Sequence, residues 1–168
     1  VAGESAHQTD NVLWWEHGRL RQCMPLLECR AMAYTAKPRF DDALVGAARD
    51  FYGLEMDVAS VELEILEDDS QRLRFLPWFI WDWRGGRDPR TVGEQFLAEG
   101  GFEPHEIRVL EALCASYVGF YQANEAATNR GVLLTDLLSG ERVYVSDDGL
   151  VGDLNKGDVL QARLVRVP

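Results

Sequence analysis

The fold class is decided by the stretch 107-IRVLEALCASYVGFYQ-122, in which the spacing of the apolar residues changes at Ser116. Before Ser116 the apolar side chains recur about every three to four residues, as they do on one face of an α-helix. After Ser116 they alternate with a period of two, which is typical of a β-strand with one buried face. The pattern therefore predicts helices before Ser116 and strands after it.

Turn residues divide the segment after Ser116 into short antiparallel strands. Turns are expected at Ser139-Gly140, at Asp147-Asp148-Gly149 and at Asn155-Lys156-Gly157. Four or five short strands with alternating faces are typical of a small barrel or a strongly curled sheet. The strands are expected over 117–122, 131–138, 142–146 and 160–165.

Helical spacing and capping residues recur through the first two thirds of the chain. Residues 1–8 show little pattern and are expected to form a tail. A helix over 60–66 is favoured only weakly, because apolar and acidic residues alternate there as in a strand. One helix is expected after a cap at Thr9 or Asp10, and Pro25 either kinks it or begins a second helix that ends near Tyr34. Further helices are expected over 40–51, 60–66 and 72–83, the last of them capped by Ser70 or beginning at Pro77. A Thr91–Glu94 capping box opens the next helix, and the final helix covers 104–114.

The predicted fold class is α+β, with an N-terminal helical layer packed on a small C-terminal antiparallel β-barrel or curled sheet. We assign residues 1–116 to the helical region and residues 117–168 to the barrel. A domain of about 50 residues is marginally stable alone. We therefore expect the barrel to share a core with the helical region.

Composition and charge exclude several classes of function. The chain has 168 residues, of which 17 are basic and 28 acidic, for a net charge of −11. Such a balance disfavours sequence-independent binding of nucleic acid or of anionic membranes, which both require Lys and Arg. The longest nearly apolar run, 75–83, is far shorter than the roughly 20 residues of a membrane span, and no secretory signal opens the sequence. We expect no membrane association, and the charge balance disfavours nucleic acid as a partner.

The charges are unevenly placed along the chain. Residues 41–69 hold ten acidic residues and one arginine, whereas residues 72–90 hold five arginines and two aspartates. One interpretation is a solvated helix face beside an intramolecular counter-patch. The other is a surface on which a partner docks.

An aromatic run inside the arginine-rich segment is the most informative feature for function. The tryptophans cannot all point in one direction on a helix, so one face is expected to fill the core. If the other face is exposed, its Trp and Arg side chains are of the types that dominate interface binding energies. The candidate interaction surface consists of Trp78, Trp81, Trp83, Arg84 and Arg87.

No motif for catalysis, cofactor binding or metal binding is recognised. His105 and Cys114 are the nearest pair of catalytic type, but nine residues on one helix separate them. Cys23, Cys29 and Cys114 are odd in number and lack metal-site spacing, which favours three buried, reduced thiols in a cytoplasmic protein. We assign no catalytic residue, no cofactor and no metal ligand. The acidic run from Glu62 to Asp69 stays open as a site for a hard cation.

Four segments in the second half carry a resemblance to a known group of proteins. They are Trp78-Phe79-Ile80-Trp81-Asp82-Trp83, then Thr91 with Phe96-Leu97, then Asp136 to Glu141, and finally Gly157 to Arg163. In their order and spacing, over about residues 75–167, they resemble an uncharacterised family of bacterial proteins whose members often carry an SEC-C zinc motif. The resemblance implies a fold module of unknown activity. The closely spaced thiolates of the SEC-C motif are absent here, so zinc is not carried over.

These observations favour a non-enzymatic protein-interaction or assembly module. Its partner is expected to be another protein or a second copy of the chain. One alternative is a nucleic-acid-associated small barrel that stacks bases on Tyr117, Phe120, Tyr121 and Tyr144. Another is an acidic metal-dependent hydrolase built on the carboxylates of residues 62–69.

Overall fold

The structure is a computed structural model that describes residues 20, 22–125, 131–145 and 154–166. It divides into two compact units, which meet in sequence between Ala115 and Ser116. Unit 1 is the helical part up to Ala115, and unit 2 runs from Ser116 to Arg166. The predicted tail and the helix expected after Thr9 or Asp10 lie outside the described residues, apart from Leu20 at the end of that helix.

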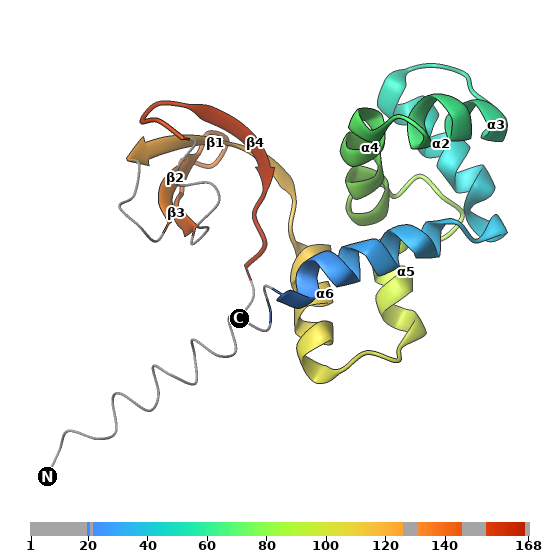
Figure 1. The fold of residues 1–168 in the computed structure, drawn as a ribbon, viewed down its shortest axis with the longest axis horizontal. Coiled ribbons are helices and arrows are strands. Elements are labelled where there is room, and N and C mark those ends of the chain that lie inside the picture. The colour runs from blue at the N-terminus through green and yellow to red at the C-terminus, as the bar shows by residue number, and fades with distance from the viewer. Residues whose placement is uncertain (1–19, 21, 126–130, 146–153, 167–168) are drawn as a thin grey trace, which may run out of the picture. The chain divides into compact units, whose positions relative to one another are not determined.

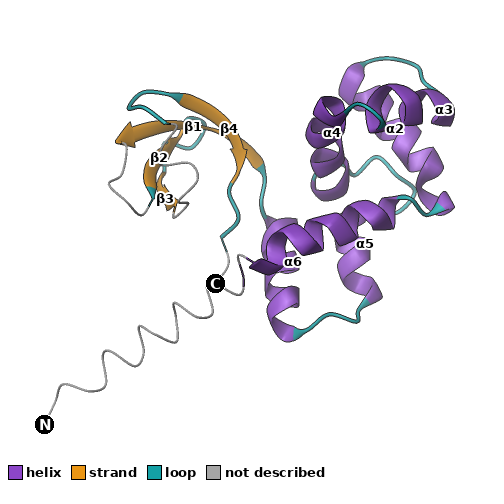
Figure 2. Ribbon diagram, in the orientation of Figure 1, coloured by secondary structure: helices purple, strands orange, loops and turns teal. Residues whose placement is uncertain are grey.

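Unit 1 consists of helices joined by short connections (Figures 1 and 2). The helix over 22–35 is drawn in blue in Figure 1, and it contains Pro25 without beginning there. The remaining helices are the 3₁₀ turn η1 (Pro38–Phe40), α2 (Asp41–Tyr52), α3 (Val58–Val61), the π-helical turn η2 (Glu62–Leu66), α4 (Asp69–Trp81), α5 (Val92–Glu99) and α6 (Pro104–Ala115).

Capping residues fix several of these boundaries as predicted. Gly53 ends α2 with a φ of 69°, a conformation that glycine adopts without steric cost. At the start of α5, the Glu94 N–H donates to the Thr91 hydroxyl at 3.1 Å and the Thr91 N–H donates to the Glu94 carboxylate at 2.7 Å. This reciprocal pair is the predicted capping box.

The start of α4 differs from the prediction. The Asp68 carboxylate, and not Ser70, caps the helix by accepting from the N–H groups of Ser70 and Gln71. An aspartate therefore satisfies two of the donors that the first turn leaves open. Pro77 lies inside α4, so the helix does not begin there.

Aromatic side chains form the centre of unit 1. Phe75 and Phe79, one turn apart on α4, are fully buried and stack with ring centroids 5.8 Å apart. Trp83 continues this column, with its ring 5.7 Å from that of Phe79. Burial of a large apolar side chain contributes roughly 1.5–3 kcal/mol, so the aromatic run is a main source of stability.

Unit 2 is an antiparallel sheet in the order β3-β2-β1-β4. Tyr121 at the centre of β1 pairs with Asp136 on one side and with Leu160 on the other. The buried face is formed by Tyr121, Ala123, Val132 and Leu134. The strands are β1 (Val118–Glu125), β2 (Val132–Asp136), β3 (Arg142–Val145) and β4 (Val159–Arg163).

The α+β class is confirmed, but the barrel is not supported. In the part of the chain that the structure describes, β3 and β4 lie at opposite edges of the sheet and do not pair. A barrel requires its first and last strands to close the sheet. Alternating faces are the same in an open sheet and in a closed one, so the sequence pattern does not distinguish them.

The cysteines differ in part from the prediction. All three lie among the described residues and none forms a disulfide, but Cys29 is exposed, whereas Cys23 and Cys114 are partly buried. The expectation of three buried thiols is therefore wrong for Cys29. Within the described ranges, no helix is long and apolar enough to cross a membrane.

Candidate interaction site

A pocket of ≈ 340 Å³ lies in unit 1 between α2, the connection from α4 to α5, and the first turn of α5. Four arginines contribute to its wall, and we call it the arginine pocket. They are Arg39 next to α2, Arg49 on α2, and Arg87 and Arg90 in the connection after α4. Its volume is at the lower end of the range of sites that hold small ligands or single side chains of a partner.

One face of α2 supplies the first wall. Asp42, Gly46 and Arg49 follow one another at intervals of four and three residues, so they share one side of the helix. Gly46 faces the Trp83 indole of the opposite wall, where a β-carbon would lie 3.4 Å from the ring, in ordinary van der Waals contact.

The connection after α4 supplies the opposite wall and is held by Trp83. The indole N–H of Trp83 donates to the Asp50 carboxylate at 2.9 Å, which ties the connection to α2. Gly85 lies against the same indole, where a β-carbon would be 2.6 Å from the ring. Any larger residue at Gly85 would therefore push the connection away from Trp83.

Two of the four arginines have close carboxylate partners. Arg90 forms a double contact with Asp88, the closest at 2.7 Å. Arg39 donates to Glu99 at 2.6 Å and also to the hydroxyl of Tyr34. These contacts hold the connection and η1 in place.

The other two arginines have weak partners. Arg87 donates to Asp42 at 3.2 Å, and their side chains are 95% and 87% exposed. Arg49 lies 3.8 Å from the Asp50 carboxylate, beyond hydrogen-bond distance. Exposed pairs of this kind contribute about 0–1 kcal/mol, so both guanidinium groups can exchange partners at low cost.

Hydrogen bonds lower the pKa of the carboxylates that hold Arg90 and Arg39. Hydrogen bonds from the Arg90 side chain lower the pKa of Asp88 to about 2. Hydrogen bonds from Lys37, and then from Tyr34 and Arg39, lower the pKa of Glu99 to about 2. The wall carries four arginines and three aspartates, Asp42, Asp50 and Asp88, and Glu99 is bound to Arg39 beside it.

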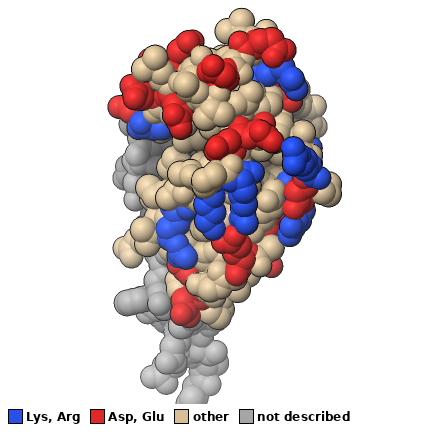
Figure 3. Space-filling view, turned by 90° about the vertical axis from the view of Figure 1, so that its right-hand side faces the viewer, with Lys and Arg blue, Asp and Glu red and all other residues tan. Residues whose placement is uncertain are grey.

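Basic and acidic side chains thus balance around the pocket, in a chain with a net charge of −11. Figure 3 shows the side of the molecule that faces right in Figure 1, where basic side chains gather in a band between acidic ones. Such an alternation favours a partner of defined charge pattern over general attraction of polyanions.

The five residues of the predicted interaction surface separate into two groups. Trp81 and Trp83 are only 3% and 8% exposed, and Trp78 is partly buried, so these tryptophans act in packing. Arg84 is exposed and forms an ion pair with Glu94 at 2.9 Å. Arg87 is exposed and lines the pocket, with Trp83 at its base.

The sequence did not identify Arg39 or Arg49 as site residues. It included Arg90 only as a member of the arginine-rich segment 72–90. Arg49 is the one basic residue between positions 41 and 69, and it lies three residues after a helical glycine. Its isolated position in an acidic segment was the available signal for Arg49. Nothing local in the sequence indicated Arg39.

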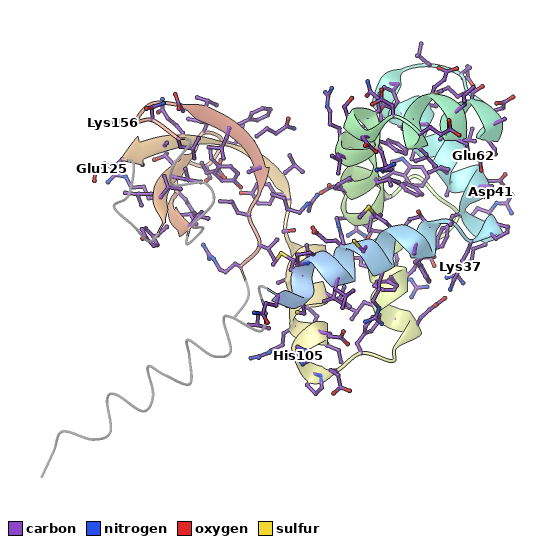
Figure 4. All side chains as sticks on the ribbon, in the orientation of Figure 1. Lys37, Asp41, Glu62, His105, Glu125 and Lys156 are labelled. Atoms are coloured by element: carbon purple, nitrogen blue, oxygen red, sulfur yellow. The ribbon has the colours of Figure 1, made fainter. Side chains whose placement is uncertain are left out.

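Apart from its three aspartates, the pocket wall carries no nucleophile of the usual kinds. Its described lining residues include no Ser, Thr, Cys, Lys, Tyr or His. His105 lies on α6, as Figure 4 shows, and the other two histidines lie outside the described ranges. In the described parts of the chain, no three His, Cys, Asp or Glu side chains are grouped as metal ligands, and this includes residues 62–69.

Residues 46–168 match the model of a family of unknown function, DUF7986. The chain belongs to this family. The DUF7986 segment contains Arg49, Trp83, Arg87 and Arg90, whereas Arg39 and Asp42 precede it. No curated protein and no solved structure is detectably similar to the chain. The expected resemblance to an uncharacterised family is confirmed, and the link to the SEC-C motif stays a prediction.

Proposed function

We propose that the chain is a non-enzymatic module that binds another protein, and that the partner docks on the arginine pocket. The observation that carries the proposal is the wall itself, on which Arg49 and Arg87 are exposed and have only weak partners. Arg is enriched among the residues that dominate binding at protein interfaces. The resemblance to proteins with an SEC-C motif adds no activity to this proposal.

The acidic groups of the pocket support binding over catalysis. A general base works best with a pKa near neutrality and a carboxylate open to the substrate. The pKa of Asp88 is instead lowered to about 2 by Arg90, and Asp50 accepts the Trp83 indole N–H. These two carboxylates take part in hydrogen bonds that hold the wall of the pocket in place.

The experiment uses the full chain as bait in extracts of its native host. We would compare the wild type, the pocket variant Arg49→Glu/Arg87→Glu and the control Arg74→Glu/Arg142→Glu. The control changes the net charge equally at two exposed arginines outside the pocket. Any protein captured by the wild type is then purified, and its binding is measured by calorimetry.

We expect the purified partner to bind the wild type and the control and to lose most of its affinity for the pocket variant. Equal binding to all three chains would place the interface elsewhere and overturn the proposal. Turnover of a nucleotide, ester or phosphodiester by the purified chain would overturn it as well. If the partner is a second copy of the chain, the wild type, the pocket variant and the control are compared by sedimentation at several concentrations.

A second candidate function has one specific observation in its favour. Tyr117, Phe120 and Tyr144 of unit 2 are 53%, 48% and 57% exposed. Exposed aromatic rings are needed for bases to stack on a protein surface. Tyr121, the fourth aromatic residue of that hypothesis, is buried, and residues 117–168 have more acidic than basic side chains. Titration with single-stranded oligonucleotides decides this candidate, because true binding would be tight and would weaken with salt.

A further inference from the structure

We infer that the arginine pocket binds the carboxylate of one Asp or Glu side chain of a partner protein, between Arg49 and Arg87. The inference rests on the proposed function and specifies the chemistry of the partner. It also assigns a role to Asp42, whose carboxylate binds Arg87 when no partner is present and releases it when the partner binds.

The first step of the argument is the position of the two arginines. Arg49 projects from α2 and Arg87 from the connection after α4, so they reach the pocket from its two walls. Each guanidinium group has five N–H donors. The only hydrogen bond that Arg87 makes within the described residues is the one to Asp42, and Arg49 has only the 3.8 Å contact with Asp50. A carboxylate is the acceptor whose geometry matches these planar groups best.

The second step is the low cost of releasing Asp42. Its side chain is 87% exposed, so water solvates the carboxylate as soon as Arg87 leaves. Asp42 also lies in the first turn of α2, where the helix dipole stabilises a negative charge without an ion pair. The exchange therefore replaces a loose intramolecular contact with a contact to the partner.

The third step is the charge of the pocket. Arg39 and Arg90 are paired with Glu99 and Asp88, so the available positive charge lies on Arg49 and Arg87. A single carboxylate balances one of these guanidinium groups, whereas a phosphate dianion would bring a second negative charge close to Asp42 and Asp50. Charge complementarity thus favours an Asp or Glu side chain over a phosphate group.

The test uses a short soluble peptide with one central Glu, the same peptide with Gln in its place, and inorganic phosphate. Each is titrated into the isotopically labelled full chain and followed by NMR at the arginine Nε–H and tryptophan indole N–H groups. We expect the Glu peptide to shift the signals of Arg49, Arg87 and Trp83, and the Gln peptide to leave them in place.

Two pairs of variants separate site binding from general electrostatics. Arg87→Gln should weaken the Glu peptide about tenfold, since it removes a charge-assisted contact, whereas the control Arg74→Gln should have little effect. Asp42→Asn should strengthen binding several-fold, because it removes the competitor for Arg87. Its control is Asp41→Asn, an equal charge change at the neighbouring exposed residue labelled in Figure 4, which does not line the pocket.

Several outcomes would overturn the inference. They are equal effects of the pocket variants and their controls, tighter binding of phosphate than of the Glu peptide, and no shift with any probe. None of these outcomes by itself overturns the proposed function. That proposal depends on whether a purified partner distinguishes the pocket variant from the wild type.

Discussion

Trp81 of α4 lies directly against Gly93 of α5, so closely that a β-carbon on Gly93 would be 2.3 Å from Cε3 of the indole. Both residues are buried. The absence of a side chain at position 93 is therefore a packing requirement of the contact between α4 and α5. Gly46 on α2 also faces a tryptophan, but a β-carbon at Gly46 would lie 3.4 Å from the Trp83 indole.

These two glycines give the first prediction. Gly93→Ala should lower the free energy of unfolding by about 1–3 kcal/mol or more, because the methyl group overpacks a buried indole. Gly46→Ala should be neutral or should raise stability by up to about 1 kcal/mol, because alanine is the better helix former. Urea unfolding of both variants measures the difference. Equal effects would show that Trp81 moves aside without cost.

The contrast between these glycines also shows how far the sequence could predict the structure. The Thr91–Glu94 box located the start of α5, because the interaction that forms it is confined to four residues. The indole that excludes a side chain from Gly93 comes from twelve residues earlier and leaves no local pattern. Helix ends could thus be predicted from neighbours in the chain, but the partners of buried faces could not.

The candidate site follows the same rule. Arg87 was recognised because it belongs to a run of arginines, and Trp83 because it belongs to an aromatic run. Arg39 and Arg49 reach the same pocket from the other side of the connection, more than 30 residues away. Contacts between distant segments depend on how the helices pack, which apolar spacing alone does not determine.

The second prediction concerns the N-cap of α5. Thr91 is only 1% exposed, and its hydroxyl accepts the Glu94 N–H. Thr91→Ala should lower the free energy of unfolding by about 1–2 kcal/mol through loss of the cap. Thr91→Ser keeps the hydroxyl and should retain most of that stability. Thermal unfolding of the two variants compares them, and a serine variant as unstable as the alanine variant would contradict the role of the hydroxyl.

The third prediction concerns pH. Glu99 has a pKa of about 2, compared with an ordinary value of 4.5, chiefly because of the hydrogen bonds from Lys37. A carboxyl group with a lowered pKa in the folded state stabilises it above the ordinary value, and this contribution is lost as the pH falls from about 4.5 towards 2. We expect the unfolding midpoint in urea to fall steadily over this window.

The variant that isolates this effect is Glu99→Gln. It removes the titrating group, so it should be less stable than the wild type at pH 7 and should lose less stability between pH 4.5 and 2. Glu111→Gln is a suitable control, since Glu111 is an exposed residue of α6. An unchanged slope in Glu99→Gln would assign the acid sensitivity to other carboxyl groups, such as Asp88, whose pKa is also about 2.

The fourth prediction concerns the cooperativity of the two units. Unit 2 has its own apolar cluster around Tyr121 and Leu134, but it holds only about 50 residues, a size at which domains are marginally stable. The expectation from the sequence that the sheet shares a core with the helical region therefore stays a prediction. Its consequence is one unfolding transition for the whole chain.

Leu110→Ala in unit 1 tests that consequence. Leu110 is fully buried, so its truncation should cost about 2–5 kcal/mol. If the transition is shared, amide hydrogen exchange of the slowest protons in β1 and β2 should accelerate as much as that of α6, because both would exchange through the same global unfolding. Leu134→Ala in β2 is the reciprocal variant and should accelerate exchange in α4. If each variant affected only its own unit, the two units would be independent domains and the shared core would be wrong.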